Sequence, residues 1–580
     1  MLRLERAVVV AFAVLLLSYL VWLPSFEGPD EPEHIAHVRA WATGASIEVP
    51  AEGARPEWGY QIVQPPLYYA LAGVWSRVVG PEFTDAIAIN PTQNPGFPFI
   101  RHDVEGERFP WSGAHRGLRW LRLPSVVFGL LTAWVLVWMG RELFGSDSWS
   151  RALWLAAVLL TPNIVQAFAS VSNDGLAILA ASVGLAAAVA VIRSEGPATR
   201  WAGLCGLALG IAIGIKLTAV IAAATAATIL VVDAVRKKDL RTTLTTLAAA
   251  LLPLIVCVAA LLASNQLRFG DATLETVRNE MLPAFVRPMP VPLAWLLRRI
   301  VELVPPTFGV DLAWQTVRLP GFSLAFFGVW LAACLATGTS LMLRRQDEPS
   351  SWIGWIGWIS LFWALIFLVW MSRNQTDLQL RHLLVVWPVL MLPLAGALRA
   401  IPFRSEWAKG SVATLLILGL LAGNVAVLIQ FGSFQRPAED PDFDRDYHTY
   451  LYSHVRNPQR AKSYLRYGTH LLYDIEAAYR AQDWEGVVAR VESEAPPPAF
   501  VSTAQHIRVM ALAQLGRVPE ALDTLAELAP DYPEARPTHV TLILSSRGPA
   551  AARALLEKYL AETEGTAREA LLQLQQRVDR

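Results

Sequence analysis

A cluster of acids and histidines follows directly after the first apolar run of the sequence. The run VVVAFAVLLLSYLVWLP ends at residue 24 and is followed within 13 residues by Asp30, Glu31, Glu33, His34 and His37. A carboxylate can take the proton of an attacking hydroxyl or amine, as a general base does. Glu33, His34 and His37 have the residue types of a zinc site, although three potential ligands on one helix are weak evidence. Acids in front of Pro32 are also good helix N-caps, and capping is the alternative for Asp30 and Glu31.

A second set of polar residues lies at the predicted ends of other apolar segments. They share one expected membrane depth and are Arg119, Arg122, Asn173, Asp174, Lys216, Arg381 and His382. Ionisable residues in a membrane are costly and therefore functional by default, although a residue at a helix end reaches water easily. Acids beside lysine and arginine suit transfer of a group from a phosphate-linked donor, because the cations hold the phosphate that leaves. The alternatives are interfacial anchoring for Lys216 and Arg381, and helix capping for Asn173 and Asp174.

Transmembrane helices are the elements predicted to position these residues. Of the 580 residues, 54% are hydrophobic and 17% are charged, which is the composition of a membrane protein. Runs long enough to cross a bilayer, about 20 residues, recur at 7–24, 121–140, 152–171, 175–193, 201–216, 217–234, 243–263, 321–342, 352–371, 383–398 and 411–431. We predict an all-α, polytopic transmembrane bundle of about eleven helices. A cleaved signal peptide is the alternative for the first run, but WLPSFEG offers no good cleavage site.

The charges between these segments predict their orientation. If the N-terminus with Arg3 and Arg6 is cytoplasmic, every short connection on that side is basic, as the positive-inside rule requires. Long loops at 25–118 and 264–320 then lie on the outer face. The first is expected to carry surface helices at 32–43 and 65–79 and an irregular segment at 90–99. The net charge of zero argues against nucleic acid as a partner, and three cysteines inside predicted helices imply no disulfide.

The last part of the chain is charged and has the periodicity of soluble helices. We place the transmembrane domain at 1–431, a linker at 432–468 and a helical domain at 469–580. QDWEGVVARV at 482–491 aligns with GRVPEALDTL at 516–525 at an offset of 34 residues, the period of tetratricopeptide helix pairs, and a degenerate third copy lies at 546–560. A plain helical bundle is the alternative. Because the tail gathers no catalytic residue types, we expect it to dock a protein partner.

Taken in order, these motifs resemble the GT-C superfamily of membrane glycosyltransferases, which includes the protein O-mannosyltransferases and the lipid A aminoarabinose transferases. The resemblance rests on the Asp-Glu pair and PPLYY of the first outer loop, and on LRWLRLPSVVFGLLTAW at 118–134, SNDGLAILAA at 172–181, GLALGIAIGIKLTAV at 206–220 and LRHLLVVWP at 380–388. It is nearest to a bacterial branch with a PDEP-x-H motif and an FGV-x-x-AW-x-x-x-x-LP-like element, here 308–320. It covers residues 1–431 and leaves out the tail.

The resemblance implies an inverting sugar transfer from a polyprenyl-phosphate donor to a glycan, lipid or protein acceptor. The expected place is the outer face of the bacterial inner (plasma) membrane, with a cytoplasmic N-terminus and the C-terminal domain on the periplasmic side. Asp30 would be the catalytic base and Glu31 its acidic neighbour. The expected ligands of the donor phosphate are Lys216, Arg381, Arg122 and His382, and His34, Asn173 and Asp174 are the candidates for assisting residues.

Two departures from the better-studied members leave the sugar and the acceptor open. His382 follows Arg381 where a tyrosine is common, and the tail is not the usual sugar-recognition domain. No cofactor is certain, and the sequence leaves a divalent cation open. The alternative function is that of a non-catalytic membrane scaffold or transporter component, which would recruit partners through its helical-repeat tail.

Overall fold

The computed structural model divides into two compact units, one within residues 1–437 and one that contains residues 438–580. The described residues are 2–45, 61, 63–83, 104–194, 198–237, 239–274, 277, 293–313, 317–343, 351–374, 379–434, 475, 478–479, 482–493, 501–563 and 565–578. The predicted linker at 432–468 and the irregular segment at 90–99 fall almost wholly outside them. The predicted domain boundaries therefore stay predictions.

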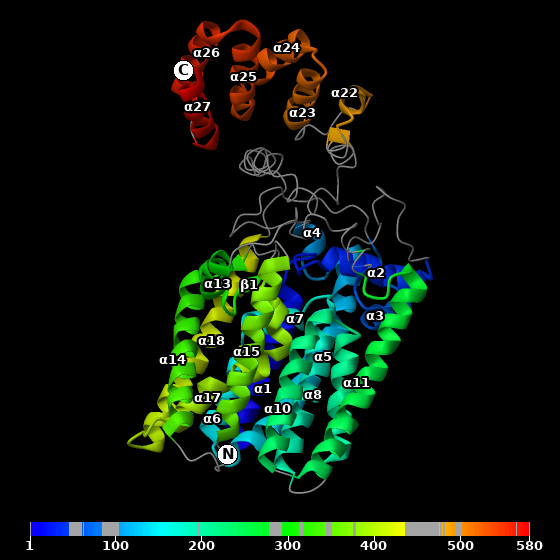
Figure 1. Ribbon diagram of the computed structural model, residues 1–580, viewed down its shortest axis with the longest axis vertical. Coiled ribbons are helices and arrows are strands. Elements are labelled where there is room, and N and C mark those ends of the chain that lie inside the picture. The colour runs from blue at the N-terminus through cyan, green and yellow to red at the C-terminus, as the bar shows by residue number, and fades with distance from the viewer. Residues whose placement is uncertain are drawn as a thin grey trace. The chain divides into compact units, whose positions relative to one another are not determined.

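Long apolar helices run side by side through the first unit (Figure 1). Within the described residues, nine helical segments are long and apolar enough to cross a membrane. They lie in α1 (Leu2–Trp22), α5 (Gly113–Phe144), α8 (Asn173–Arg193), η2 with α10 (Leu217–Ala219 and Val220–Lys237), α11 (Leu240–Phe269), α14 (Pro320–Leu343), α15 (Ser351–Asn374), η3 with α16 and α17 (Leu380–Val386, Trp387–Leu390 and Leu392–Ala400), and α18 (Glu406–Phe434). The predicted helical membrane bundle is confirmed.

Two of the eleven predicted segments are helical but shorter than a full span. The segment 152–171 is divided into α6 (Ser148–Leu159) and α7 (Pro162–Ala167). Pro162 has no backbone N–H to continue the hydrogen bonding of α6, so a new helix starts there. The other is α9 (Thr199–Ile213), which is apolar but has only 15 residues.

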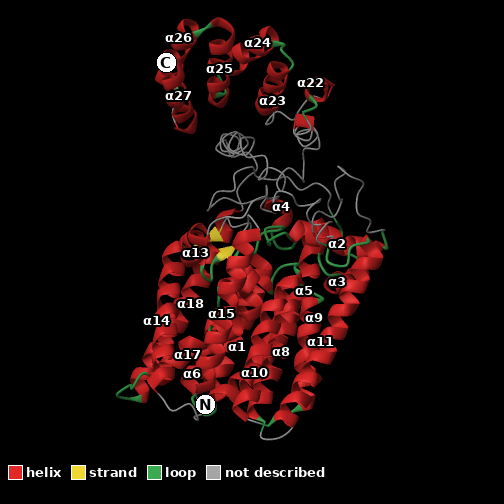
Figure 2. Cartoon of the chain, viewed as in Figure 1, coloured by secondary structure: helices red, strands yellow, loops and turns green. Residues whose placement is uncertain are grey.

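Short elements lie at the end of the bundle opposite the N-terminus (Figures 1 and 2). They are α2 (Glu31–Thr43), α3 (Leu67–Val79), α4 (Val104–Glu107), α13 (Leu293–Thr307) and the antiparallel strands β1 (Asp311–Leu312) and β2 (Val317–Arg318). The predicted helices at 32–43 and 65–79 are thus present as α2 and α3. They pack closely, because a Cβ atom on Gly73 of α3 would lie 2.7 Å from the Cβ atom of Trp41 in α2.

Ion pairs join the helix ends on the N-terminal side of the bundle. The Glu5 carboxylate accepts from Arg151 at 2.5 Å and from Arg141 at 3.3 Å. Lys409 Nζ donates to Asp147 Oδ2 at 2.7 Å, which connects the start of α6 to α18. Arg141, Arg151 and Lys409, which belong to connections predicted to be basic and cytoplasmic, therefore lie at the same end of the bundle as Glu5 of the N-terminal helix. Which side of the membrane this end faces stays a prediction.

The second unit is helical throughout its described residues. Its helices are α22 (Trp484–Ser493), α23 (Val501–Gln514), α24 (Val518–Leu528), η6 (Pro533–Ala535), α25 (Arg536–Arg547), α26 (Pro549–Glu562) and α27 (Gly565–Val578). α22 and α24 begin at the two aligned copies of the sequence, with the same offset of 34 residues. Buried aliphatic residues from all six α-helices form one core. The tetratricopeptide assignment itself stays a prediction.

Candidate active site

The carboxylate of Glu31 is held in a fully buried ion pair with Arg122. Arg122 Nε donates to Glu31 Oε1 at 2.8 Å, and Arg122 Nη2 donates to Glu31 Oε2 at 2.6 Å. The backbone N–H groups of Val171 and Gly28 donate to the same two oxygens, at 2.9 and 3.2 Å. Each carboxylate oxygen thus has two donors, and neither side chain of the pair has any exposed surface.

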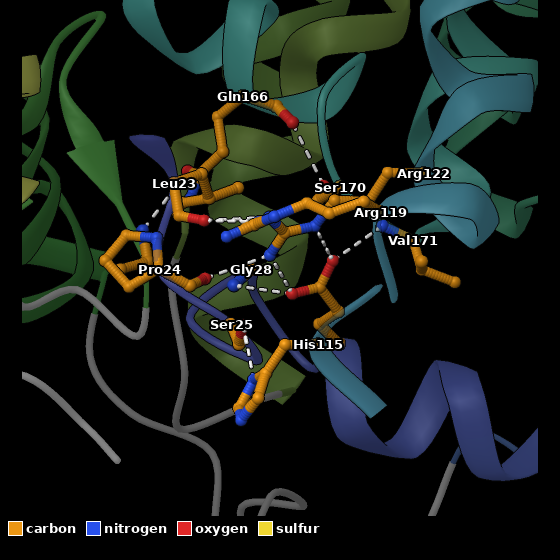
Figure 3. A network of polar contacts seen from close by, with 12 residues as sticks. Leu23, Pro24, Ser25, Gly28, His115, Arg119, Arg122, Gln166, Ser170 and Val171 are labelled. Carbon is orange, nitrogen blue, oxygen red and sulfur yellow. Dashed lines mark hydrogen bonds and ion pairs between the residues drawn. The ribbon is translucent and has the colours of Figure 1, made fainter. Parts of the chain in front are cut away.

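Arg122 also fixes the C-terminal end of α1. Its Nη1 and Nη2 atoms donate to the carbonyl oxygens of Leu23 and Pro24, at 2.8 and 3.0 Å. Arg119, one turn earlier on α5, donates from Nη1 to the same Leu23 oxygen at 2.7 Å, so the two arginines lie side by side (Figure 3). A phosphate cannot reach a guanidinium that is fully buried and used in this way. The predicted roles of Arg122 in phosphate binding and of Glu31 in catalysis therefore do not fit their surroundings.

Asp30 forms a second ion pair, with Arg381 of η3. Arg381 Nη2 donates to Asp30 Oδ2 at 2.5 Å, and the two side chains are 14% and 11% exposed. Asp30 precedes α2 with a φ of 57°, a left-handed conformation that aspartate adopts more readily than most residues. Its side chain makes no capping hydrogen bond to α2. Asp30 thus occupies the N-cap position of α2, as the capping alternative predicted, but its carboxylate faces Arg381 and makes no capping hydrogen bond.

Lys216 and Asp174 form a third pair, at the start of η2 and α8. Lys216 Nζ donates to Asp174 Oδ1, and both side chains are more than nine-tenths buried. Ser172 is the N-cap of α8 and accepts from the Asp174 N–H group. Asn173 donates from Nδ2 to the carbonyl oxygen of Ile215, the residue before Lys216. The capping alternative for Asn173 and Asp174 is therefore wrong, because Ser172 takes that role.

These pairs lie close enough to act on one another. The charge of Arg381 acts on Asp174 as well as on its partner Asp30. His34 and His382 both lie within electrostatic range of the two acids and the two cations. The structure thus brings six of the predicted site residues to one end of the bundle, from four separate parts of the chain. They are Asp30, His34, Asp174, Lys216, Arg381 and His382.

Two buried tryptophans hold the segment that carries Arg381 and His382. Trp387 follows η3 and donates from Nε1 to Thr161 Oγ1 at 3.2 Å. Trp154 of α6 donates from Nε1 to the carbonyl oxygen of Pro388 at 2.7 Å. Both indole rings are fully buried. Because the break between α6 and α7 supplies Thr161, it also helps to position the cationic end of the site.

His34 and His37 project from α2 toward the ring of Tyr69 in α3. His37 stacks on Tyr69 with ring centroids 3.8 Å apart, and His34 stacks at 5.8 Å. His34 Nδ1 lies 2.8 Å from the Tyr69 hydroxyl, and His37 Nε2 accepts from Trp41 Nε1 at 3.2 Å. Burial lowers the pKa of His34 to about 4 and the pKa of His37 to about 3, so both rings are neutral at pH 7. Among the described side chains, none of the His, Cys, Asp and Glu groupings could hold a metal ion, and the zinc alternative gains no support.

Three further residues lie beside the site without a motif that predicted them there, namely Tyr69, Gln61 and Asp311. The Tyr69 hydroxyl donates to Gln61 Oε1 at 3.0 Å. Asp311, on β1, accepts from Arg318 Nε at 3.0 Å and is within range of the Arg381 charge. Burial raises the pKa of Asp311, against the opposing effect of both arginines. In the sequence, the PPLYY segment contains Tyr69 and the element at 308–320 contains Asp311, but neither motif predicted a role for these residues.

An apolar groove with a volume of about 250 Å³ lies between α8 and α9. It starts at Leu176, in the first turn of α8. Its lining is aliphatic and includes Leu176, Leu179 and Val183 of α8 and Leu204, Leu207 and Ile211 of α9. A hydrocarbon chain can lie in such a groove while a charged head group stays at the helix ends.

Comparison with known proteins finds one family model that is similar to part of the membrane unit. Residues 114–262 match the family described as dolichyl-phosphate-mannose-protein mannosyltransferase. This match confirms the predicted resemblance to the GT-C glycosyltransferases, and with it the predicted enzyme class. The matched segment contains Asp174 and Lys216, whereas Asp30 and Arg381 lie outside it. Among curated proteins, none matches the chain.

Several solved structures are similar to the chain at low sequence identity. ArnT from Cupriavidus metallidurans bound to undecaprenyl phosphate is 14% identical over 90% of this chain and 80% of that one, with a TM-score of 0.43. The archaeal oligosaccharyltransferase AglB from Archaeoglobus fulgidus, in complex with an inhibitory peptide and a dolichol-phosphate, is 13% identical over 80% and 59%, with a TM-score of 0.38. Arabinofuranosyltransferase AftD from Mycobacteria is 16% identical over 78% and 29%, with a TM-score of 0.39.

Proposed function

We propose that the protein transfers a sugar from a polyprenyl-phosphate donor to an acceptor hydroxyl on the outer face of the membrane. The observation that carries this proposal is the pair of neighbouring acid–cation contacts, Asp30–Arg381 and Asp174–Lys216, at one end of a membrane bundle. The family match over 114–262 supports a donor in which the sugar is linked to a lipid phosphate.

In the proposed reaction, the acceptor hydroxyl oxygen attacks the anomeric carbon of the donor sugar. The new carbon–oxygen bond forms as the bond between that carbon and the phosphate oxygen breaks, and polyprenyl phosphate leaves with the electron pair. Asp30 takes the hydroxyl proton, since a carboxylate within hydrogen-bond reach is suited to this role. Attack opposite to the leaving phosphate inverts the anomeric configuration.

Lys216 and Arg381 are the proposed ligands of the phosphate. Both cations are paired with carboxylates in the structure, so each would exchange its carboxylate for phosphate oxygens when the donor binds. Arginine can bind phosphate through two parallel hydrogen bonds, and lysine acts as a point charge. This exchange would free Asp30 from Arg381 only when the donor is present. The base would thus become available together with its substrate.

Glu31 and Arg122 have a positioning role in this proposal. They hold the segment between α1 and α2 against α5 and the turn before α8, because the ion pair also engages Leu23, Pro24 and the Val171 N–H group. Asp30 lies directly before Glu31, so this buried pair determines where the catalytic carboxylate stands. The apolar groove between α8 and α9 would take the first isoprene units of the lipid.

The proposal can be tested with undecaprenyl-phosphate-mannose and the purified protein in liposomes, using a membrane extract of the host as acceptor. Asp30→Asn should lower transfer by about 10² to 10⁴, while native mass spectrometry should still detect bound undecaprenyl phosphate. Arg381→Gln and Lys216→Gln should weaken that binding. Arg298→Gln is the matched control, because Arg298 is 79% exposed and pairs with Glu302 in its own helix.

Two results would contradict the proposal. One is transfer by the Asp30→Asn protein at the parent rate. The other is full loss of function on removal of 436–580 together with unchanged function of Asp30→Asn in cells, which would favour the scaffold alternative. A loss of one sugar from a surface glycan in the deletion strain would identify the acceptor.

A further inference from the structure

The tautomer of His34 follows from the hydrogen bonds around its Nδ1 atom. Its Nδ1 atom lies 2.8 Å from the Tyr69 hydroxyl oxygen, and that hydroxyl donates its proton to Gln61 Oε1 at 3.0 Å. A tyrosine hydroxyl has a single proton, and a glutamine carbonyl oxygen can only accept. With the Gln61 amide in this orientation, the proton between His34 and Tyr69 comes from His34 Nδ1. In a neutral imidazole, the other nitrogen, Nε2, is then an acceptor with a free lone pair.

The surroundings keep His34 in this neutral form. The residue is 3% exposed, and the ring of Tyr69 stacks against it while Tyr68 contacts it edge-on. The charges around it come from α2, α8, η2 and η3: Asp30 and Asp174 favour the imidazolium, whereas Lys216 and Arg381 oppose it. Burial outweighs all four charges and holds the pKa of His34 near 4.

His34 also lies on the same side of α2 as the proposed base. The His34 N–H group donates to the Asp30 carbonyl oxygen at 3.0 Å, so the two residues are one helical turn apart. The hydrogen bond of the His34 ring lies at Nδ1, which leaves Nε2 as the acceptor nitrogen of the neutral ring. The neutral ring of His34, with Nε2 as its hydrogen-bond acceptor, therefore lies near Asp30 among charged side chains.

We infer that His34 Nε2 accepts a hydrogen bond from a hydroxyl group of the substrate. This inference rests on the proposed function and adds a specificity residue to the same site. A phosphate oxygen is excluded as the partner, because it is an acceptor itself and would face the Nε2 lone pair without a proton between them. In this arrangement the cations bind the phosphate, and His34 binds a hydroxyl group of the transferred sugar or of the acceptor.

Two substitutions separate this role from a structural one. In His34→Asn, the side-chain amide N–H can replace the Nδ1 donor to Tyr69, but the shorter side chain cannot reach the former position of Nε2. The longer His34→Gln side chain can place its carbonyl oxygen near the former Nε2 position, while it loses the bond to Tyr69. If His34 binds a substrate hydroxyl, His34→Gln should retain more activity than His34→Asn by about tenfold or more. If His34 only supports the packing of α2 on α3, the order should reverse.

The assay is mannose transfer from undecaprenyl-phosphate-mannose in liposomes. His539→Asn is the control, because His539 Nδ1 lies 2.9 Å from the Tyr559 hydroxyl in the C-terminal unit, which repeats the His–Tyr contact without the charged cluster. It should leave transfer unchanged. Equal activity of the two His34 variants, or higher activity of His34→Asn, would overturn the inference. Absence of transfer by the parent protein from undecaprenyl-phosphate-mannose and from other undecaprenyl-phosphate-linked sugars would instead refute the proposed function.

Binding measurements identify which hydroxyl is involved. If His34 contacts the transferred sugar, His34→Asn should weaken binding of undecaprenyl-phosphate-mannose but leave binding of undecaprenyl phosphate unchanged in native mass spectrometry. If it contacts the acceptor, both lipids should bind as in the parent protein while transfer falls. Nitrogen-15 NMR of histidine-labelled protein provides a further check, because the His34 Nε2 resonance, assigned by its loss in His34→Asn, should be that of an unprotonated nitrogen. A protonated Nε2 would contradict the inference directly.

Discussion

Replacing Arg122 with methionine should destabilise the membrane unit strongly. The substitution removes four hydrogen bonds, two to the Glu31 carboxylate and one each to the carbonyl oxygens of Leu23 and Pro24. It also leaves the Glu31 carboxylate, which has no exposed surface, without its counter-ion. Removing one partner of a buried ion pair typically costs about 3–5 kcal/mol. The two remaining donors to Glu31, Gly28 and Val171, should keep the cost within this range.

The measurement is unfolding of the purified protein in mixed micelles with dodecyl sulfate, followed by the helical circular dichroism signal. Arg116→Met is the matched control on the same helix, because Arg116 pairs with Glu82 at 3.1 Å while both side chains are more than half exposed. An exposed pair contributes about 0–1 kcal/mol. The double variant Glu31→Gln with Arg122→Met should recover part of the lost stability, since it leaves no unpaired charge at the position of this pair.

A destabilisation by Arg122→Met no larger than that of Arg116→Met would refute the reasoning about burial. A double variant less stable than Arg122→Met alone would show that the buried carboxylate is not the origin of the cost. If Arg122→Met folded with parent stability but lost binding of undecaprenyl phosphate, the originally predicted phosphate role of Arg122 would be restored.

Three further perturbations follow from individual contacts. Gly73→Val should destabilise the α2–α3 contact by about 1–3 kcal/mol, because a Cβ atom at residue 73 would lie only 2.7 Å from the Cβ atom of Trp41. The expected result is faster proteolysis of the predicted first outer loop, and unchanged proteolysis would contradict the close approach of the two helices. Ser172→Ala should cost about 1 kcal/mol as a lost N-cap and should also lower transfer through the Asp174–Lys216 pair, whereas Ser545→Ala, near the end of α25 in the C-terminal unit, should change neither. The pKa of Asp147 lies below its usual value of 3.8, since partial burial raises it but the bonds from Lys409 and Ser150 outweigh that effect. The Asp147–Lys409 pair should therefore stabilise the protein fully when the pH is above this usual pKa, and the stabilisation should be lost as the pH falls below it. The unfolding midpoints of the parent and of Asp147→Asn should differ at pH 7 and become equal in strong acid. A difference that does not depend on pH would contradict the assignment.

The sequence by itself determined the helical membrane bundle. It also determined most of the charged and histidine residues that gather at the end of the bundle that carries α2 and α3. Apolar runs of sufficient length specify helices because a bilayer leaves no water for the backbone to bond. Pro32 after Asp30 and Glu31, and the Pro65–Pro66 pair before Leu67, located the starts of α2 and α3 for a similar local reason, since proline favours the first turn of a helix. The end of an apolar segment can be read from composition alone.

Only the tertiary structure decided which acid pairs with which cation. Asp30 and Glu31 are neighbours in the sequence, yet one meets Arg381 and the other meets Arg122, because the left-handed backbone at Asp30 sends successive side chains in different directions. The tautomer of His34 depends on Tyr69 and Gln61, which reach it through the packing of α2 on α3. Hydropathy predicts the depth of a residue in the membrane. It predicts neither the direction in which the side chain leaves the helix nor the residue of a neighbouring helix with which it pairs. Those depend on how helices rotate and pack, and a hydrogen bond tolerates an error of only a few tenths of an ångström in that arrangement.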